Sequence, residues 1–220
     1  MLEVAKTTIL FIGALFPIVN PLGGSPIFLS LTNDYSEPER MALSWRIAMN
    51  SFFLLVGSYL IGSHILAFFG ISLPVVQVGG GLVVISTAWA ILKRRDDQER
   101  SEIHRHVQSQ DTYNQAFYPL TLPLTVGPGS ISVAITLGAN VPRHYGFNLT
   151  AILAALIASV LIALSIFLCY GFADRMARIL GATGMTVIMR LSSFLLVCIG
   201  VQILWNGGRA LLASVPLNVH

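Results

Sequence analysis

Six long apolar runs divide the sequence, and they constrain its fold more than any other feature. They cover about residues 5–31, 41–64, 73–92, 117–139, 148–172 and 185–206. An α-helix needs about 20 residues to cross the roughly 30 Å hydrocarbon layer of a bilayer, and each run is about that long. The strands of a membrane β-barrel would be about 10 residues long and alternate in polarity, which these runs do not. The sequence therefore predicts an all-α membrane protein with six transmembrane helices.

The composition agrees with lipid as part of the solvent. Hydrophobic residues make up 55% of the chain and charged residues 10%, whereas a soluble domain has about 25% charged residues. The net charge of +3 does not indicate nucleic acid, because Lys and Arg gather between the apolar runs. The sequence contains no ATP-binding G-x-x-x-x-G-K-[ST] motif, catalytic triad or H-E-x-x-H motif. We expect no enzyme activity, no cofactor and no metal site.

One polar segment, 93–115, separates the first three runs from the last three. It holds ten of the 23 charged residues of the protein, and so polar a segment cannot lie in lipid. We therefore divide the chain into a first three-helix repeat (1–92), a charged linker (93–115) and a second three-helix repeat (116–220).

The distribution of Lys and Arg predicts the orientation in the membrane. If the six runs are six spans, the Lys and Arg residues near the run ends and in the connections divide unequally: nine fall on one side of the membrane and three on the other. The richer side holds Arg40, Arg46, Arg175, Arg178 and five residues of the linker, and the poorer side holds Lys6, Arg143 and Arg209. Cytoplasmic loops are enriched in Lys and Arg. We expect a multi-pass membrane protein with the 93–115 linker cytoplasmic and both termini on the opposite side, which in a bacterium is periplasmic.

The two halves of the chain carry similar motifs. The segment PIVNPLGGSPIFLSL (17–31) resembles PLTVGPGSISVAITL (123–137), and Gln77-Val-Gly-Gly-Gly-Leu-Val-Val aligns without gaps on Arg190-Leu-Ser-Ser-Phe-Leu-Leu-Val. Each half has three spans, so the chain enters the second half from the opposite side of the membrane. The halves are then related by inversion, as in many secondary transporters. The predicted fold is a 3+3 inverted repeat.

Prolines and glycines interrupt the first run of each half. An interior proline costs about 3 kcal/mol in a helix, and in lipid such a break survives only where protein or water covers it. We expect a broken or re-entrant first helix in each half. The new helix N-termini would offer N–H groups and partial positive charge to an anionic group such as a carboxylate. The candidate substrate-binding residues at the breaks are Asn20, Pro21, Gly23, Gly24, Ser25, Thr125, Gly127, Pro128, Gly129 and Ser130. A pair of purely structural kinks is the alternative interpretation.

Few charged residues accompany these breaks. No Asp or Glu lies in the middle of an apolar run, so a carboxylate relay inside the bilayer is not evident. Unwound carbonyl groups could still hold Na⁺, and either Na⁺ or H⁺ could be the coupling ion. Arg190 is a candidate accessory residue, although a long basic side chain near a span end commonly extends to the interface.

The residues at the breaks resemble those of the MarC family of bacterial integral membrane proteins. The resemblance is carried by Asn20-Pro21-Leu-Gly, by Gly127-Pro128-Gly129-Ser130 and by RLSSFLLVCIGVQILWNG (190–207). It covers nearly the whole chain apart from the linker and implies six spans and an inner-membrane location. Some relatives are described as transporters of small neutral amino acids such as glycine and alanine. The resemblance then implies a substrate site at Asn20, Gly23, Gly24, Thr125, Gly127, Gly129 and Ser130.

Two hypotheses of function follow. The leading one is a secondary transporter that moves glycine-like or alanine-like amino acids by alternating access, with membrane lipid and a small-molecule substrate as its partners and no nucleic acid. The alternative is a non-transporting membrane scaffold or assembly partner that acts through the 93–115 linker. The sequence does not indicate an oligomeric state.

Overall fold

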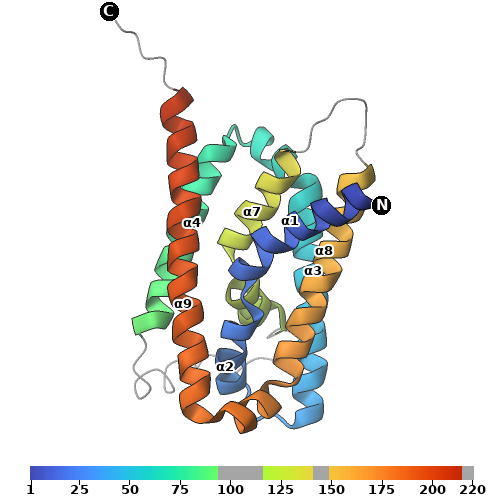
Figure 1. Ribbon diagram of the computed structural model, residues 1–220, viewed down its shortest axis with the longest axis vertical. Helices are drawn as coiled ribbons and strands as arrows, with labels where there is room; N and C mark the ends of the chain where they lie inside the picture. Colours follow the sequence, from blue (N-terminus) through green and yellow to red (C-terminus); the bar gives the residue numbers. More distant parts are fainter. Residues whose placement is uncertain (94–115, 141–148, 215–220) are drawn as a thin grey trace, which may run out of the picture.

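The structure is a computed structural model that describes residues 1–93, 116–140 and 149–214; most of the 93–115 linker and the 141–148 connection lie outside these ranges. Within them the regular structure is entirely helical (Figure 1). The helices in chain order are α1 (Leu2–Val19), α2 (Pro21–Leu31), α3 (Glu37–Phe68), α4 (Leu73–Lys93), η1 (Ala116–Thr125), α7 (Pro128–Ala139), α8 (Leu149–Gly171) and α9 (Ala173–Ser214).

The helices agree with the predicted spans. Five stretches are long and apolar enough to cross a bilayer: α1 and α2 together, then α3, α4, α8 and α9. The pair η1 and α7, bent by 70°, makes a sixth if it is counted as one span. The last predicted span, 185–206, is shorter than α9, but the backbone of α9 leaves the helical conformation at Gly181 (φ 67°). The predicted all-α class is therefore confirmed for the described residues, with five or six candidate membrane spans.

The interior of the bundle lies between α2, α3 and α8. Phe28, Ile47 and Ile166 are fully buried there. Helix α8 buries one face that is rich in alanine and leaves leucines of the other face exposed, Leu161 and Leu164 among them. Small residues on the buried face allow the close helix packing that membrane proteins use, and a face of exposed leucines suits contact with lipid.

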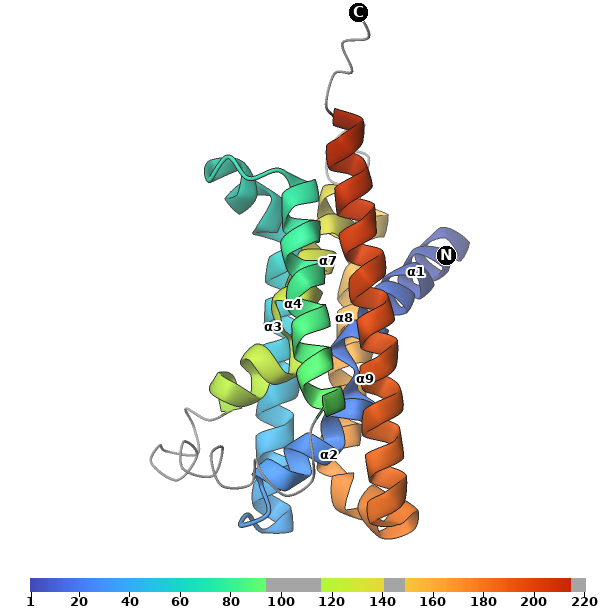
Figure 2. The same cartoon turned by 90° about the vertical axis from the view of Figure 1, so that its left-hand side faces the viewer.

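Helices α4 and α9 lie side by side along the bundle (Figures 1 and 2). Glycines permit this contact: a Cβ atom on Gly81 would lie 2.8 Å from the carbonyl oxygen of Gly200, and one on Gly207 would lie 2.7 Å from that of Pro74. The neighbouring glycines differ: a Cβ atom on Gly80 would meet Ser132 of α7, whereas one on Gly79 would meet nothing within 4 Å. The third helices of the two halves thus pack backbone to backbone.

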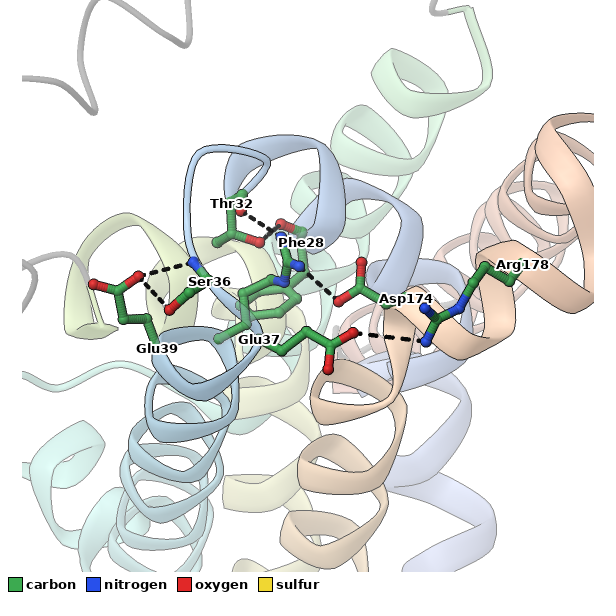
Figure 3. A network of polar contacts seen from close by, with 8 residues as sticks. Phe28, Thr32, Ser36, Glu37, Glu39, Asp174 and Arg178 are labelled. Carbon is green, nitrogen blue, oxygen red and sulfur yellow. Dashed lines mark hydrogen bonds and ion pairs between the residues drawn. The ribbon is translucent and has the colours of Figure 1, made fainter.

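A polar network joins the halves at the end of the bundle where α2 ends and α3 begins (Figure 3). The guanidinium of Arg40 in α3 lies 2.8 Å from the carboxylate of Asp174, at the start of α9, and donates a hydrogen bond of 3.0 Å to the carbonyl oxygen of Thr32. The two charged side chains are only 11% and 28% exposed. Nearby, Ser36 and Glu39 form a capping box that begins α3. Arg40 therefore ties the turn after α2 to the corner between α8 and α9.

Candidate functional site

The first break is a single left-handed residue. Asn20 has φ 47° and ψ 59°, ends α1 by donating its N–H to the carbonyl of Phe16, and begins α2 by accepting the N–H of Gly23 on its side chain at 3.1 Å. Asparagine adopts this conformation more readily than most residues, and it is also a favoured N-cap. Pro21 follows at the first helical position, where its missing N–H costs nothing. The predicted break at Asn20-Pro21 is confirmed.

The other two prolines of this segment remain inside helices, Pro17 in α1 and Pro26 in α2. Pro26 cannot donate to the carbonyl of Leu22, four residues earlier. The Ser25 hydroxyl donates to this carbonyl instead, at 3.2 Å. Ser25 is fully buried, so its hydroxyl stabilises the helix rather than facing a cavity.

The second break lies between η1 and α7. Segment η1 is a π-helix with extended backbone at Tyr118 and Leu122. Each of these residues precedes a proline, which disfavours helical geometry at the residue before it. Two threonine hydroxyls donate to carbonyls inside this irregular segment: Thr121 to Ala116 at 2.6 Å, and Thr125 to Leu120 at 2.7 Å. These bonds supply partners for backbone groups that lipid could not solvate.

Helix α7 restarts after this break at Pro128. Gly127 occupies the N-cap position in extended conformation and offers no side-chain cap. The first N–H groups of a helix have no partner within the helix, so this end of α7 can donate to a ligand. In α2, by contrast, the Asn20 side chain already occupies one such N–H.

The two breaks meet at one cavity of about 320 Å³. Its lining includes eight of the ten predicted site residues: Asn20, Gly23, Gly24, Thr125, Gly127, Pro128, Gly129 and Ser130. Pro21 and Ser25 do not line it, and Arg190 is exposed elsewhere on α9. Helices α4 and α9 complete the wall and contribute two polar residues that the motifs did not indicate, Thr87 and Ser193.

Tyr170 is a third residue that the sequence did not indicate. Its hydroxyl lies 3.0 Å from that of Thr125. The Thr125 hydroxyl donates its proton to the carbonyl of Leu120, so Tyr170 is the donor in the bond between the two hydroxyls. Its ring stacks on Phe28 with centroids 4.7 Å apart, and a Cβ atom on Gly24 would lie 2.5 Å from its oxygen. Tyr170 of α8 thus positions both breaks, although it does not line the cavity.

The cavity offers polarity without charge. None of its described lining residues is ionisable; the polar groups are one amide, four hydroxyls and backbone at the breaks. Within the described ranges no three His, Cys, Asp or Glu side chains come together as a metal site would require. Such a lining suits a small molecule that has donors and acceptors but little net charge.

Close packing at the second break leads to a test. A Cβ atom on Gly129 would overlap a methyl group of Val84 in α4. We expect Gly129→Ala to lower the free energy of unfolding by about 1–3 kcal/mol through overpacking. Val84→Ala in the same chain should recover at least half of this loss. Thermal unfolding in detergent of the two single variants and the double variant measures both effects, and simple additivity would contradict the contact.

The chain was compared with known proteins. The profile of the family described as "MarC family integral membrane protein" matches residues 5–212. This chain belongs to the MarC family. Similar relatives include a membrane protein of Aquifex aeolicus, 32% identical over 93% of this chain and 94% of the relative. The inner membrane protein MarC of Salmonella typhimurium is 31% identical over 94% of this chain and 96% of the relative. The membrane protein YvbG of Bacillus subtilis is 33% identical over 88% of this chain and 90% of the relative. No solved structure matches.

The family match covers all the described helices almost completely and both breaks. It confirms the resemblance noted at the Asn-Pro and Gly-Pro motifs. As a member of the MarC family, the chain is an integral membrane protein.

Proposed function

We propose that this MarC-family protein is a secondary transporter of small neutral amino acids, resembling glycine or alanine, in a bacterial inner membrane. The observation that carries the proposal is an uncharged, largely apolar cavity with a few polar groups, which both helix breaks line, one from each half of the chain. Relatives from Salmonella are named as inner membrane proteins, which supports the location. Half-helix ends at such a cavity are a common way to bind a solute inside a membrane.

The two charged ends of an amino acid would bind different parts of the cavity. Its carboxylate would accept hydrogen bonds from the uncapped N-terminus of α7, where the helix dipole also favours negative charge. Its ammonium group would donate to oxygens of Asn20, Thr125 and Ser130, all of which line the cavity. The hydroxyl proton of Ser130 is directed to the Gly127 carbonyl at 3.2 Å, which leaves its oxygen as an acceptor.

The size of the substrate would be limited by close packing. Gly24 contacts Tyr170, and Gly129 contacts Val84, so neither break can move outward without displacing a neighbouring helix. The apolar side chains of Ile27 and Leu196 also line the cavity. The glycines at the breaks would favour a substrate with a small side chain next to the helix ends, within a cavity that as a whole is larger than alanine.

Reciprocal packing supports the proposed 3+3 inverted repeat. The broken segment of the first half, α2, packs on α9, and that of the second half, α7, packs on α4. Both contacts fall in the parts of α4 and α9 whose sequences align. Gly23 of α2 contacts Ser192 of α9. A Cβ atom on Gly80 of α4 would lie 2.6 Å from the Cβ atom of Ser132 in α7. Each break thus contacts the third helix of the other half, so the two halves could exchange conformations in an alternating-access cycle.

The charge distribution supports the proposed orientation. The N-terminal end of α1 and the C-terminal end of α9 lie toward one end of the bundle (Figure 1). The turn between α2 and α3 and the start of α9 lie at the other end, together with Arg40, Arg175 and Arg178. The enrichment of Lys and Arg on the cytoplasmic side would place the termini in the periplasm.

Uptake into proteoliposomes tests the proposal. We expect labelled alanine and glycine to accumulate at least tenfold faster than in empty liposomes, and leucine and phenylalanine to remain at the background. Gly127→Leu should abolish uptake, because Gly127 lines the cavity and a Cβ atom there would already lie 3.0 Å from the carbonyl oxygen of Pro123, so the break would have to shift. Imposing a Na⁺ or a pH gradient would identify the coupling ion.

Deletion of 94–115 separates transport from the scaffold hypothesis. A transporter should keep its flux without this segment, whereas a scaffold acting through it would lose its function. Equal background uptake of every amino acid in the intact chain would refute the transport proposal.

A further inference from the structure

A second cavity of about 330 Å³ lies between α1, α4, α7 and α9. Each of these helices lines both cavities, with different residues for each except Ile18 of α1. On α9, Ser193 and Leu196 border the first cavity, and Ile199, Ile203 and Asn206 border the second. This spacing of three or four residues keeps the five on one face of the helix. The second cavity therefore continues the first toward the end of the bundle that holds the chain termini.

Ile18 is the residue that borders both cavities. It lies two residues before the left-handed break at Asn20 and is 8% exposed. Because its side chain is apolar and lies beside the break, a change in the angle between α1 and α2 would move it. Ile18 is thus placed to separate the cavities or to let them join.

The polar groups of the second cavity are amides and one hydroxyl. The Gln77 amide donates to the Thr136 hydroxyl at 3.4 Å, and the Gln202 amide donates to the side-chain oxygen of Asn206 at 2.9 Å. Gln77 and Thr136 belong to different halves of the chain. Each amide has two donor hydrogens and an oxygen that accepts two bonds. The cavity can therefore bind both ends of a zwitterion without a charged side chain.

Gln202 and Asn206 share one hydrogen bond, and the remaining polar groups of both amides need a partner other than lipid. Gln202 and Asn206 lie on a membrane-spanning helix and are exposed within the described chain. A polar group in hydrocarbon costs several kcal/mol unless protein or water satisfies it. Water or a polar solute in the cavity would supply this partner.

We propose that the second cavity is a separate binding site for the same class of small zwitterionic solute, with Ile18 as the partition between the two sites. The proposal rests on the proposed function, because its solute is the substrate proposed for the transporter. Solute would pass from the amide-lined cavity at the terminal end to the cavity at the breaks when Ile18 moves.

Cysteine labelling tests the water access of the second cavity. The two native cysteines, Cys169 and Cys198, are first replaced by alanine. Ile199→Cys then places a thiol in the cavity, and Val201→Cys is its matched control, since Val201 is 51% exposed, lies two residues further along α9 and does not line the cavity. A membrane-impermeant methanethiosulfonate reagent should modify Ile199→Cys at least tenfold faster. Equal rates would overturn the proposal.

Protection by alanine or glycine tests binding at this site. Either amino acid should slow labelling of Ile199→Cys at least threefold. The protection should persist with Asn20→Gly, which alters the first site, and disappear with Gln77→Leu, which alters the second. Protection lost with Asn20→Gly but kept with Gln77→Leu would assign it to the first site and overturn the proposal.

The uptake and protection experiments test the transport function and the second site separately. Uptake without protection would refute the second site and leave the transport function standing. Protection without uptake would support the second site while refuting transport. Loss of both in the intact chain would refute both.

Discussion

Asn20→Leu should reduce alanine uptake at least tenfold and destabilise the fold. Leucine at φ 47° costs about 1–2 kcal/mol, and loss of the side-chain bond to the Gly23 N–H costs about 1 kcal/mol more. The substitution also replaces the one amide of the break cavity by an apolar group. Initial uptake rates in proteoliposomes and thermal unfolding in detergent measure the two effects.

Asn20→Gly is the matched control for this experiment. Glycine adopts a positive φ without strain, and replacing a cap residue by glycine costs only a few tenths of a kcal/mol. The variant should therefore unfold close to the wild-type temperature while uptake still falls about tenfold. Uptake at the wild-type rate in Asn20→Gly would show that the amide only shapes the break and binds no substrate.

Asp174→Asn should lower the free energy of unfolding by about 2 kcal/mol. Loss of one partner from a fully buried ion pair costs about 3–5 kcal/mol, because the other charge remains buried. We expect less here because Asp174 is 28% exposed, while Arg40 at 11% is nearly enclosed. The Nε atom of Arg40 is already buried without a partner. Arg40→Met in the Asp174→Asn background should restore part of the loss, which a double-mutant cycle measures.

The neighbouring pair of Arg178 and Glu37 is the control for this cycle. Their charged atoms are 3.7 Å apart, and both side chains are about two-thirds exposed. Exposed ion pairs contribute about 0.2–1 kcal/mol or nothing measurable, so Glu37→Gln should change stability little. A loss as large as that of Asp174→Asn would show that this end of the bundle depends on total charge rather than on the enclosed pair in Figure 3.

Positions of the breaks could be predicted because their causes are local. A proline lacks an N–H, and asparagine adopts left-handed backbone, so Asn20-Pro21 interrupts a helix wherever that helix lies. The same reasoning did not show that Pro17 and Pro26 stay inside helices. For Pro26, the Ser25 hydroxyl bonds to the carbonyl that the proline leaves free. The proposed role of Ser25 in binding therefore has no support from its position.

Residues that face the breaks from other helices carried no signal in the sequence. Tyr170, Val84 and Thr87 lie in ordinary apolar segments, and nothing in their spacing relates them to Asn20 or Gly127. The exposed position of Arg190 likewise depends on which face of α9 packs on α4. The Arg40–Asp174 pair joins positions far apart along the chain.

By itself the sequence determined the membrane environment, the helical class, the two breaks and the helix boundaries within a few residues, except for the last helix, which extends well beyond the predicted span 185–206. These properties depend on hydropathy and on backbone conformation, which act over a few neighbouring residues. Only the tertiary structure decided that the breaks share one cavity, that Tyr170 links them and that a second cavity continues the first beyond Ile18. Helix packing brings together residues that are distant in the chain, and it depends on the side chains of both helices at once.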